Sequence, residues 1–196
     1  PTGGHGMLLM ESTADQVVQF NEIDDARHER TKLAIPESSG WTMTSEDATS
    51  WTPVQNPDRI AANPPFGSVM AEDGSNIAWI TAAGETSTID HAIMLKQLGS
   101  MTPDGRAVFI IGGPAKTARS ESARKEHYGR GSKSAFFKHL HDNFGVVDHF
   151  TVDGDLYAKQ GAGWNVDVIV IQGRKASRTA LPSAKAPRML STWADV

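Results

Sequence analysis

The tetrapeptide Asn63, Pro64, Pro65 and Phe66 combines groups that suit binding of a flat, amine-bearing ring. It follows Arg59–Ala62, a short run that we expect to form the end of a buried strand. Because proline donates no N–H group and fixes its own φ, two consecutive prolines must end that strand in a rigid turn. An amide oxygen and a neighbouring carbonyl suit an exocyclic amino group, and an aromatic ring suits stacking on a base. Asn-Pro is also a common turn signal, so a plain turn remains open at this point.

A glycine-rich turn near the amino terminus is a second candidate for ligand binding. Gly3, Gly4 and Gly6 allow positive φ and close approach of a ligand, and we expect a helix with free N–H groups to open after them. The next apolar run, Val17–Asn21, reads as a strand and is followed by Glu22. A glycine turn followed by an acid after the next strand is the arrangement that binds a ribose diol in doubly wound folds.

With these features in place, the sequence resembles the class I S-adenosylmethionine-dependent methyltransferases, within them the Asn-Pro-Pro-Phe branch that methylates the N6 amine of DNA adenine. It is similar to phage and plasmid methyltransferase domains that are often joined to a helicase-like polypeptide. The resemblance implies S-adenosylmethionine as cofactor, DNA as partner, and a helicase-like domain or a separate recognition subunit as a further partner. It implies that the catalytic residues are Asn63, Pro64, Pro65 and Phe66, and that the cofactor-binding residues are Thr2, Gly3, Gly4, Gly6, Glu22, Ile23, Asp47, Ala48 and Asn63.

The resemblance also implies a domain organisation. In the family a strand precedes the glycine turn and lies in the middle of the sheet, whereas residues 1–196 open at the turn itself. We therefore expect this strand to be supplied from outside these residues, since a sheet without it leaves buried backbone groups unpaired. We expect residues 1–174 to form the methyltransferase domain and residues 175–196 to form an extended C-terminal tail.

The remaining pattern alternates between strands and helices, which predicts an α/β fold with a doubly wound, mostly parallel sheet. The resemblance makes this a Rossmann-like methyltransferase sheet with helices on both faces and an antiparallel last strand. Ligands of such sheets bind beyond the carboxyl ends of the strands. The expected strands are Val17–Asn21, Trp41–Thr44, Arg59–Ala62, Gly105–Ile111, Val147–Val152 and Val166–Gln172, and the main expected helices are Asp24–Ala34, Ile89–Met101 and Ser132–Phe144.

Two further segments are candidates for function. Residues 67–88 follow the Asn63 turn and form either a lid over the site or a plain surface excursion. The segment 116–138 is locally basic, and we expect a flexible loop that feeds a helix and contacts phosphates, with an ordinary solvated loop as the alternative. Its basic residues are Lys116, Arg119, Arg124, Lys125, Arg130, Lys133 and Lys138, against Glu121 and Glu126.

Composition narrows the class of protein without choosing a function. The 196 residues suffice for one domain with a substantial core, and 39% of them are hydrophobic. There is no cysteine, which excludes disulfides and thiolate metal sites, and no apolar run approaches the roughly 20 residues of a membrane span. His139 and His141 would point to different faces of a helix, so we expect no metal site. We expect a cytoplasmic protein of a bacterial or phage-infected cell.

Other functions remain open at this stage. The acceptor could be another planar amine, namely RNA adenine, cytosine N4 or a protein glutamine. A nicotinamide-dependent oxidoreductase would also use a glycine turn and an acid, but its Gly-x-Gly-x-x-Gly spacing is absent here. The third alternative is a non-catalytic nucleic-acid-binding module of a larger assembly. The net charge of −4 does not indicate a nucleic-acid binder by itself.

Overall fold

The computed structural model describes residues 2–9, 12–13, 15–35, 40–156, 158, 163–177 and 186–195. Its helices are α1 (Asp25–Ala34), α2 (Ile89–Ser100), α3 (Glu121–Tyr128) and α4 (Gly131–Asn143), with short 3₁₀ turns η1 (Met7–Leu9) and η2 (Gly154–Leu156). Its strands are β1 (Val18–Asn21), β2 (Trp41–Thr44), β3 (Arg59–Ala62), β4 (Trp79–Thr81), β5 (Gly84–Thr86), β6 (Arg106–Gly112), β7 (Phe144–Val152), β8 (Val166–Arg174) and β9 (Arg188–Leu190).

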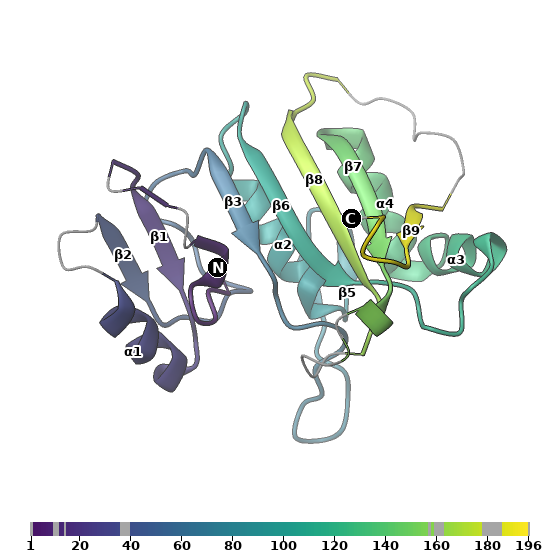
Figure 1. The fold of residues 1–196 in the computed structure, drawn as a ribbon, viewed down its shortest axis with the longest axis horizontal. Coiled ribbons are helices and arrows are strands. Elements are labelled where there is room, and N and C mark those ends of the chain that lie inside the picture. Colours follow the sequence, from purple (N-terminus) through teal and green to yellow (C-terminus); the bar gives the residue numbers. More distant parts are fainter. Residues whose placement is uncertain are drawn as a thin grey trace.

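The strands of the main layer fall into two groups (Figure 1). A five-stranded sheet has the order β3-β6-β8-β7-β9, and β1 and β2 form a separate parallel pair. Strand β3 runs parallel to β6, while β8 runs antiparallel to both β6 and β7. This mixed α/β arrangement confirms the predicted fold class, including the antiparallel strand that begins at Val166.

The core lies between the five-stranded sheet and the helices α2 and α4, which Figure 1 shows behind it. Strands β6 and β8 are apolar along most of their length, so every second residue can enter this core. Arg174, at the end of β8, donates hydrogen bonds to the carbonyls of Leu98, Gly99 and Met101 at the end of α2. The buried residues of the core include Phe109 and Ile111 of β6, Ile169 and Ile171 of β8, Met94 and Leu98 of α2, and Phe136 and Leu140 of α4.

The basic segment does not form the flexible loop that the sequence suggests. It contains α3, whose first turn is capped by the Ser120 hydroxyl accepting from the Ala123 N–H, and then α4. The hydroxyl of Tyr128 anchors α3 to β8 through a 3.0 Å hydrogen bond to Asp167, and burial raises the pKa of this tyrosine. Asp167 also accepts from Thr151 at 2.7 Å, so the buried carboxylate joins α3 to β7 as well.

Three other local expectations need correction. The glycine turn leads into the 3₁₀ turn η1 rather than into a helix over the described residues 2–9. Residues 67–88 contain the hairpin β4–β5, which the sequence pattern did not predict. The C-terminal segment contributes β9, which pairs parallel to β7, while Trp193 is exposed. Residues 178–185 and 196 of that segment lie outside the described residues.

Within the described part of the chain, no helix is both long and apolar enough to cross a membrane. The same residues contain no group of three or more His, Cys, Asp or Glu side chains arranged to hold a metal ion.

Candidate functional site

The glycine turn lies against the carboxyl end of β1. Gly4 and Gly6 have φ of +56° and +75°, in the region that favours glycine. A Cβ atom at Gly3 would lie 2.0 Å from the Phe20 ring, so no other residue fits there without displacing that ring. The N–H of Gly3 donates to the Asn21 carbonyl at 2.7 Å, which sets the turn directly beside the strand.

Glu22 holds this turn in place, so the predicted acid and the predicted glycines do come together. The side chain is only 5% exposed. Its Oε2 accepts the Gly4 N–H at 2.7 Å, and its Oε1 accepts the Asp24 N–H at 2.9 Å. A ligand hydroxyl at Glu22 would therefore share a carboxylate that is already fixed in orientation by two main-chain donors.

The loop after β2 reaches the same edge through Asn21, a residue that the sequence analysis did not single out. Asn21 is buried, its Oδ1 accepts the Glu46 N–H at 2.9 Å, and its Nδ2 donates to the Glu46 carbonyl at 2.8 Å. Asp47 is exposed and accepts both the N–H and the hydroxyl of Thr49, and Ala48 is buried. The sequence signal that could have identified Asn21 is a polar residue at the end of a predicted buried strand.

Two of the residues predicted to bind the cofactor, Thr2 and Ile23, lie beside the glycine turn and Glu22. Ile23 follows Glu22 and is 64% exposed. The Thr2 hydroxyl oxygen is inaccessible to solvent and has no hydrogen-bond partner within the part of the chain that the structure describes. The Ile23 side chain is therefore open to solvent at this edge, whereas the Thr2 hydroxyl is enclosed by the turn.

The Asn63 turn follows β3 as predicted. Ala62 and Pro64 are buried, whereas Asn63 and Phe66 are exposed, Phe66 by 38%. The Asn63 side chain makes no hydrogen bond to any residue that the structure describes. The buried neighbours therefore fix the backbone of the turn while the amide remains available to a ligand.

Asp90, at the start of α2, fixes the other end of this turn and was missed by the sequence analysis. It is 1% exposed; its Oδ1 accepts the Gly67 N–H at 3.3 Å and its Oδ2 accepts the Gly112 N–H at 2.9 Å. Gly112 also packs against Phe66, because a Cβ there would lie 3.3 Å from the Phe66 Cβ. Burial raises the pKa of Asp90, and the two N–H donors oppose that shift.

The basic segment carries less unbalanced charge than its sequence suggests. Acidic partners face four of its side chains, in the pairs Lys116–Asp155, Lys125–Glu121, Arg130–Glu126 and Lys138–Asp142. Lys133 is half-buried beside the His127 ring, and burial lowers its pKa. Arg124 donates to the Arg119 carbonyl at 3.0 Å. Arg119 remains exposed, and the pairs at Lys125 and Arg130 are solvent-accessible, where such pairs are weak.

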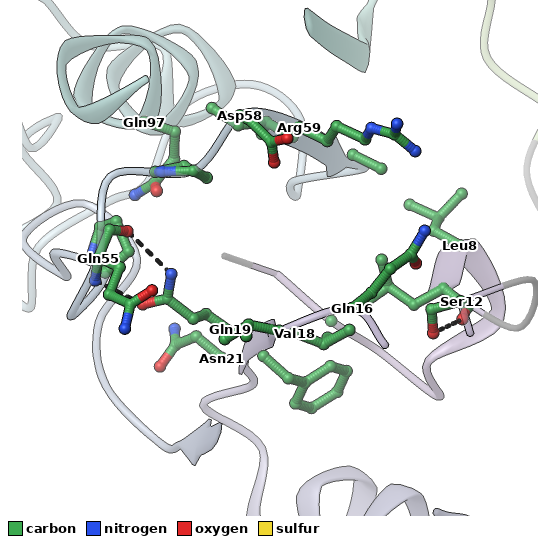
Figure 2. A pocket seen from close by; sticks show the side chains of 18 of the residues that line it. Leu8, Ser12, Gln16, Val18, Gln19, Asn21, Gln55, Asp58, Arg59 and Gln97 are labelled. Atoms are coloured by element: carbon green, nitrogen blue, oxygen red, sulfur yellow. Dashed lines mark hydrogen bonds between the residues drawn. The ribbon is translucent and has the colours of Figure 1, made fainter. Parts of the chain in front are cut away.

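A pocket of about 680 Å³ lies between β1 and β3 (Figure 2). Val18 and Gln19 line it on the β1 side, and Asp58 and Arg59 line it on the β3 side. Its lining comes from β1, β3 and the segments just before them, with contributions from η1 and α2, and of the predicted site residues only Thr2 and Gly3 reach it. The pocket therefore is not the site formed by Glu22, Asp47 and Asn63.

Neither a scan of protein-family models nor a search of curated protein sequences finds a match to this chain, whereas solved structures share its fold. One is a Listeria monocytogenes protein assigned to the class I S-adenosylmethionine-dependent methyltransferases, with 12% identity, a TM-score of 0.63, and coverage of 98% of this chain and 57% of that one. Another is a modification subunit assigned to a type I restriction enzyme of Vibrio vulnificus YJ016, with 12% identity, a TM-score of 0.62, and coverage of 96% and 44%.

A third similar structure is the type IIG restriction endonuclease BpuSI, with 21% identity, a TM-score of 0.56, and coverage of 91% of this chain and 22% of that one. The chain thus spans about half the length of the first two structures. These likenesses at low identity establish the fold: the described residues adopt the fold of class I methyltransferases.

The Asp90 bridge makes a prediction for NMR. Because one carboxylate accepts both N–H groups, the amide signals of Gly67 and Gly112 will titrate together, with a midpoint above the ordinary aspartate pKa of about 3.9. By linkage, a raised folded-state pKa gives a contribution to stability that is complete below the unfolded-state pKa. That contribution is lost as pH rises through the folded-state value.

Asp90→Asn should abolish the shared titration, because a side-chain amide does not ionise in this pH range. Asp73→Asn, in the exposed turn ahead of β4, should leave it intact. Separate midpoints for the two glycines, or a shared midpoint below the ordinary value, would contradict the bridge.

Proposed function

We propose that this chain is the catalytic domain of an S-adenosylmethionine-dependent methyltransferase that acts on the N6 amine of adenine in DNA. One observation carries the proposal: the Asn63 amide is exposed and, among the described residues, unpaired at the carboxyl end of β3, in a turn held rigid by Pro64 and Asp90. The glycine turn and Glu22 lie at the carboxyl end of β1, which Figure 1 shows pointing the same way as β3.

The residues at the end of β1 fit the cofactor. The Glu22 carboxylate has accepting capacity left beyond its two N–H donors and would take the ribose hydroxyls. The exposed Ile23 side chain would cover one face of the cofactor adenine, and the Asp47–Ala48 loop would meet its edge. Thr2, Gly3, Gly4 and Gly6 would surround the methionine portion of the cofactor.

The cofactor supplies a methyl group on a sulfonium, which is already an excellent leaving group, so the chain's task is chiefly to position the acceptor. Adenine N6 is a weak nucleophile because its lone pair is delocalised into the ring. Hydrogen bonds from N6–H to the Asn63 Oδ1 and the Pro64 carbonyl favour a more tetrahedral nitrogen and direct its lone pair outward. Phe66 stacks on the base, and this offsets, by about 1–3 kcal/mol, part of the few kcal/mol that base flipping costs.

The choice of adenine N6 over other planar amines rests on the resemblance of the Asn63–Phe66 tetrapeptide to the adenine-specific motif. The modification subunit from Vibrio vulnificus adds support, because restriction enzymes act on DNA. DNA would reach the site over α3 and the residues that flank it, where Arg119, Lys125 and Arg130 are exposed. A helicase-like domain or a recognition subunit would supply sequence specificity.

The first prediction separates cofactor binding from catalysis. Glu22→Ala should weaken S-adenosylmethionine binding by about 1.5–3 kcal/mol, because it removes a charge-assisted hydrogen bond to the ribose. Calorimetry measures the affinity, and Glu29→Ala on the exposed face of α1 is the matched control. Equal affinities for Glu22→Ala and the unmodified chain would remove Glu22 from the cofactor site.

The second prediction concerns the chemistry at Asn63. Asn63→Ala should bind S-adenosylmethionine almost normally but lose most methyl transfer, because the missing hydrogen bond polarises the acceptor amine rather than the cofactor. The measurement is transfer of labelled methyl to duplex DNA. Asn56→Ala, an exposed asparagine ahead of β3, serves as the control and should keep its activity. If Asn63→Ala transferred methyl groups as fast as the unsubstituted protein, Asn63 would not polarise the acceptor amine.

The third prediction concerns binding to DNA phosphates. Changing Arg119, Lys125 and Arg130 together to Ala should weaken DNA binding for all sequences alike and lower the log–log salt slope by about 0.9 for each phosphate that is no longer neutralised. The control triple is Arg30, Lys32 and Arg188, which are also exposed. If the variant with Arg119, Lys125 and Arg130 changed to Ala kept the original salt slope, DNA would be held elsewhere, for instance by another domain. The acidic partners of Lys125 and Arg130 would then already neutralise these charges.

A further inference from the structure

Two carboxylates are buried where α2, α3 and α4 meet the sheet. Asp90, at the start of α2, is 1% exposed, and Asp167, in β8, is 0% exposed. Main-chain N–H groups donate to Asp90, and the hydroxyls of Tyr128 and Thr151 donate to Asp167. Because a buried negative charge is costly even with such donors, a nearby positive charge would stabilise both carboxylates further.

Lys133, in the first turn of α4, brings a positive charge to this region. Its Nζ lies 3.3 Å from both ring nitrogens of His127 in α3. The side chain is half-buried; this burial lowers the pKa of Lys133, and the carboxylates of Asp90 and Asp167 act in the opposite direction. The ammonium group is therefore held in the interior by the attraction of these two carboxylates.

The packing of α2 on α4 brings Lys133 to the side of Asp90. The rings of His91 and Phe136 stack with their centroids 3.8 Å apart and an interplanar angle of 4°. His91 follows Asp90 directly, and Phe136 lies three residues after Lys133, on the same side of α4. Burial raises the pKa of Asp90, and the charge of Lys133 is among the effects that oppose this shift.

We propose that Lys133 is a positioning residue for the Asn63 turn, because its ammonium group is the buried countercharge of the Asp90 carboxylate. Ionised Asp90 accepts the N–H groups of Gly67 and Gly112 at once, one with each oxygen. A proton on one of these oxygens would turn an acceptor into a donor and weaken the bridge. The attraction acts through space in the low-dielectric interior, so it depends on where α4 places the ammonium group.

This role separates Lys133 from the other basic residues of the segment 116–138. Lys125 and Arg130 are exposed, whereas the Lys133 ammonium lies beside the His127 ring, between α4 and α3. The helices proposed to contact DNA are thereby joined to the turn proposed to hold the acceptor amine, and this consequence rests on the proposed function. The countercharge itself does not, because it is a property of the protein without cofactor or DNA.

Other ionisable groups surround this pair of charges. Burial lowers the pKa of His91 to about 3 and that of His127 to about 4, so both rings are neutral in the alkaline range where Lys133 loses its proton. Neither ring can therefore supply the charge that stabilises the ammonium group. The remaining ionisable groups around the pair, from α3, β7 and β8, are Arg124, Tyr128, His149 and Asp167.

NMR titration of the protein alone tests the proposal. Asp90→Asn should lower the pH at which the Lys133 ammonium group loses half of its protons, because the Asp90 charge stabilises the ammonium form. Asp73→Asn, in the exposed turn ahead of β4, is the matched control and should leave this midpoint unchanged. An unchanged midpoint in Asp90→Asn, or an equal change in both variants, would overturn the proposal.

The reciprocal measurement follows the shared titration of the Gly67 and Gly112 amide signals. Lys133→Met should move their midpoint upward, since Asp90 loses its countercharge, whereas Lys133→Arg should keep it near the original value. Lys138→Met, at an exposed position of the same helix, is the control for the loss of one positive charge and should have no effect.

A midpoint in Lys133→Met equal to that of the unsubstituted protein would contradict the proposal, and so would the same upward movement in Lys138→Met. The two measurements change opposite partners, so either one decides the question if the variant used in the other does not fold. Neither cofactor nor DNA is present, and a negative result here is therefore distinct from a failure of methyl transfer.

Discussion

Buried carboxylates that accept main-chain N–H groups hold both halves of the candidate site in position. Glu22 accepts from Gly4 and Asp24 at the end of β1, and Asp90 accepts from Gly67 and Gly112 near the end of β3. Each carboxylate is removed from water, and these hydrogen bonds offset part of the cost of that burial. The turns that carry the glycines and Asn63 are therefore fixed before any ligand arrives, which lowers the ordering cost of binding.

The spacing between these halves depends on how far apart β1 and β3 lie. Glu22 follows β1 and Asn63 follows β3, so the distance between the proposed cofactor and the proposed acceptor amine is set by what separates the two strands. In-line transfer is sensitive to misplacements of about 1 Å. Within the described residues, the Gln19 side chain bridges β1 to the main chain of Gln55 ahead of β3, by donating to its carbonyl at 2.8 Å and accepting its N–H at 3.0 Å, and this bridge helps to set that distance.

Most of the fold could be predicted from the sequence because its signals are local. The apolar runs at Trp41–Thr44 and Arg59–Ala62 become β2 and β3 with the expected bounds, and the prolines end β3 where the chain geometry requires it. The pairing of Gly4 with Glu22 also followed from motif spacing. What failed depends on partners far apart in the chain. The Asp90 bridge joins three segments, and α3 is held by Tyr128 bonding to Asp167.

The identity of the acceptor atom is the central claim about this protein. The most direct measurement is incubation of the protein with labelled S-adenosylmethionine and duplex DNA, followed by digestion and separation of the nucleosides. We expect the label to be recovered as N6-methyl-2′-deoxyadenosine. Label in N4-methylcytosine would contradict the assigned acceptor while keeping the enzyme class. DNA free of label, from a protein that binds the cofactor, would contradict the assigned substrate.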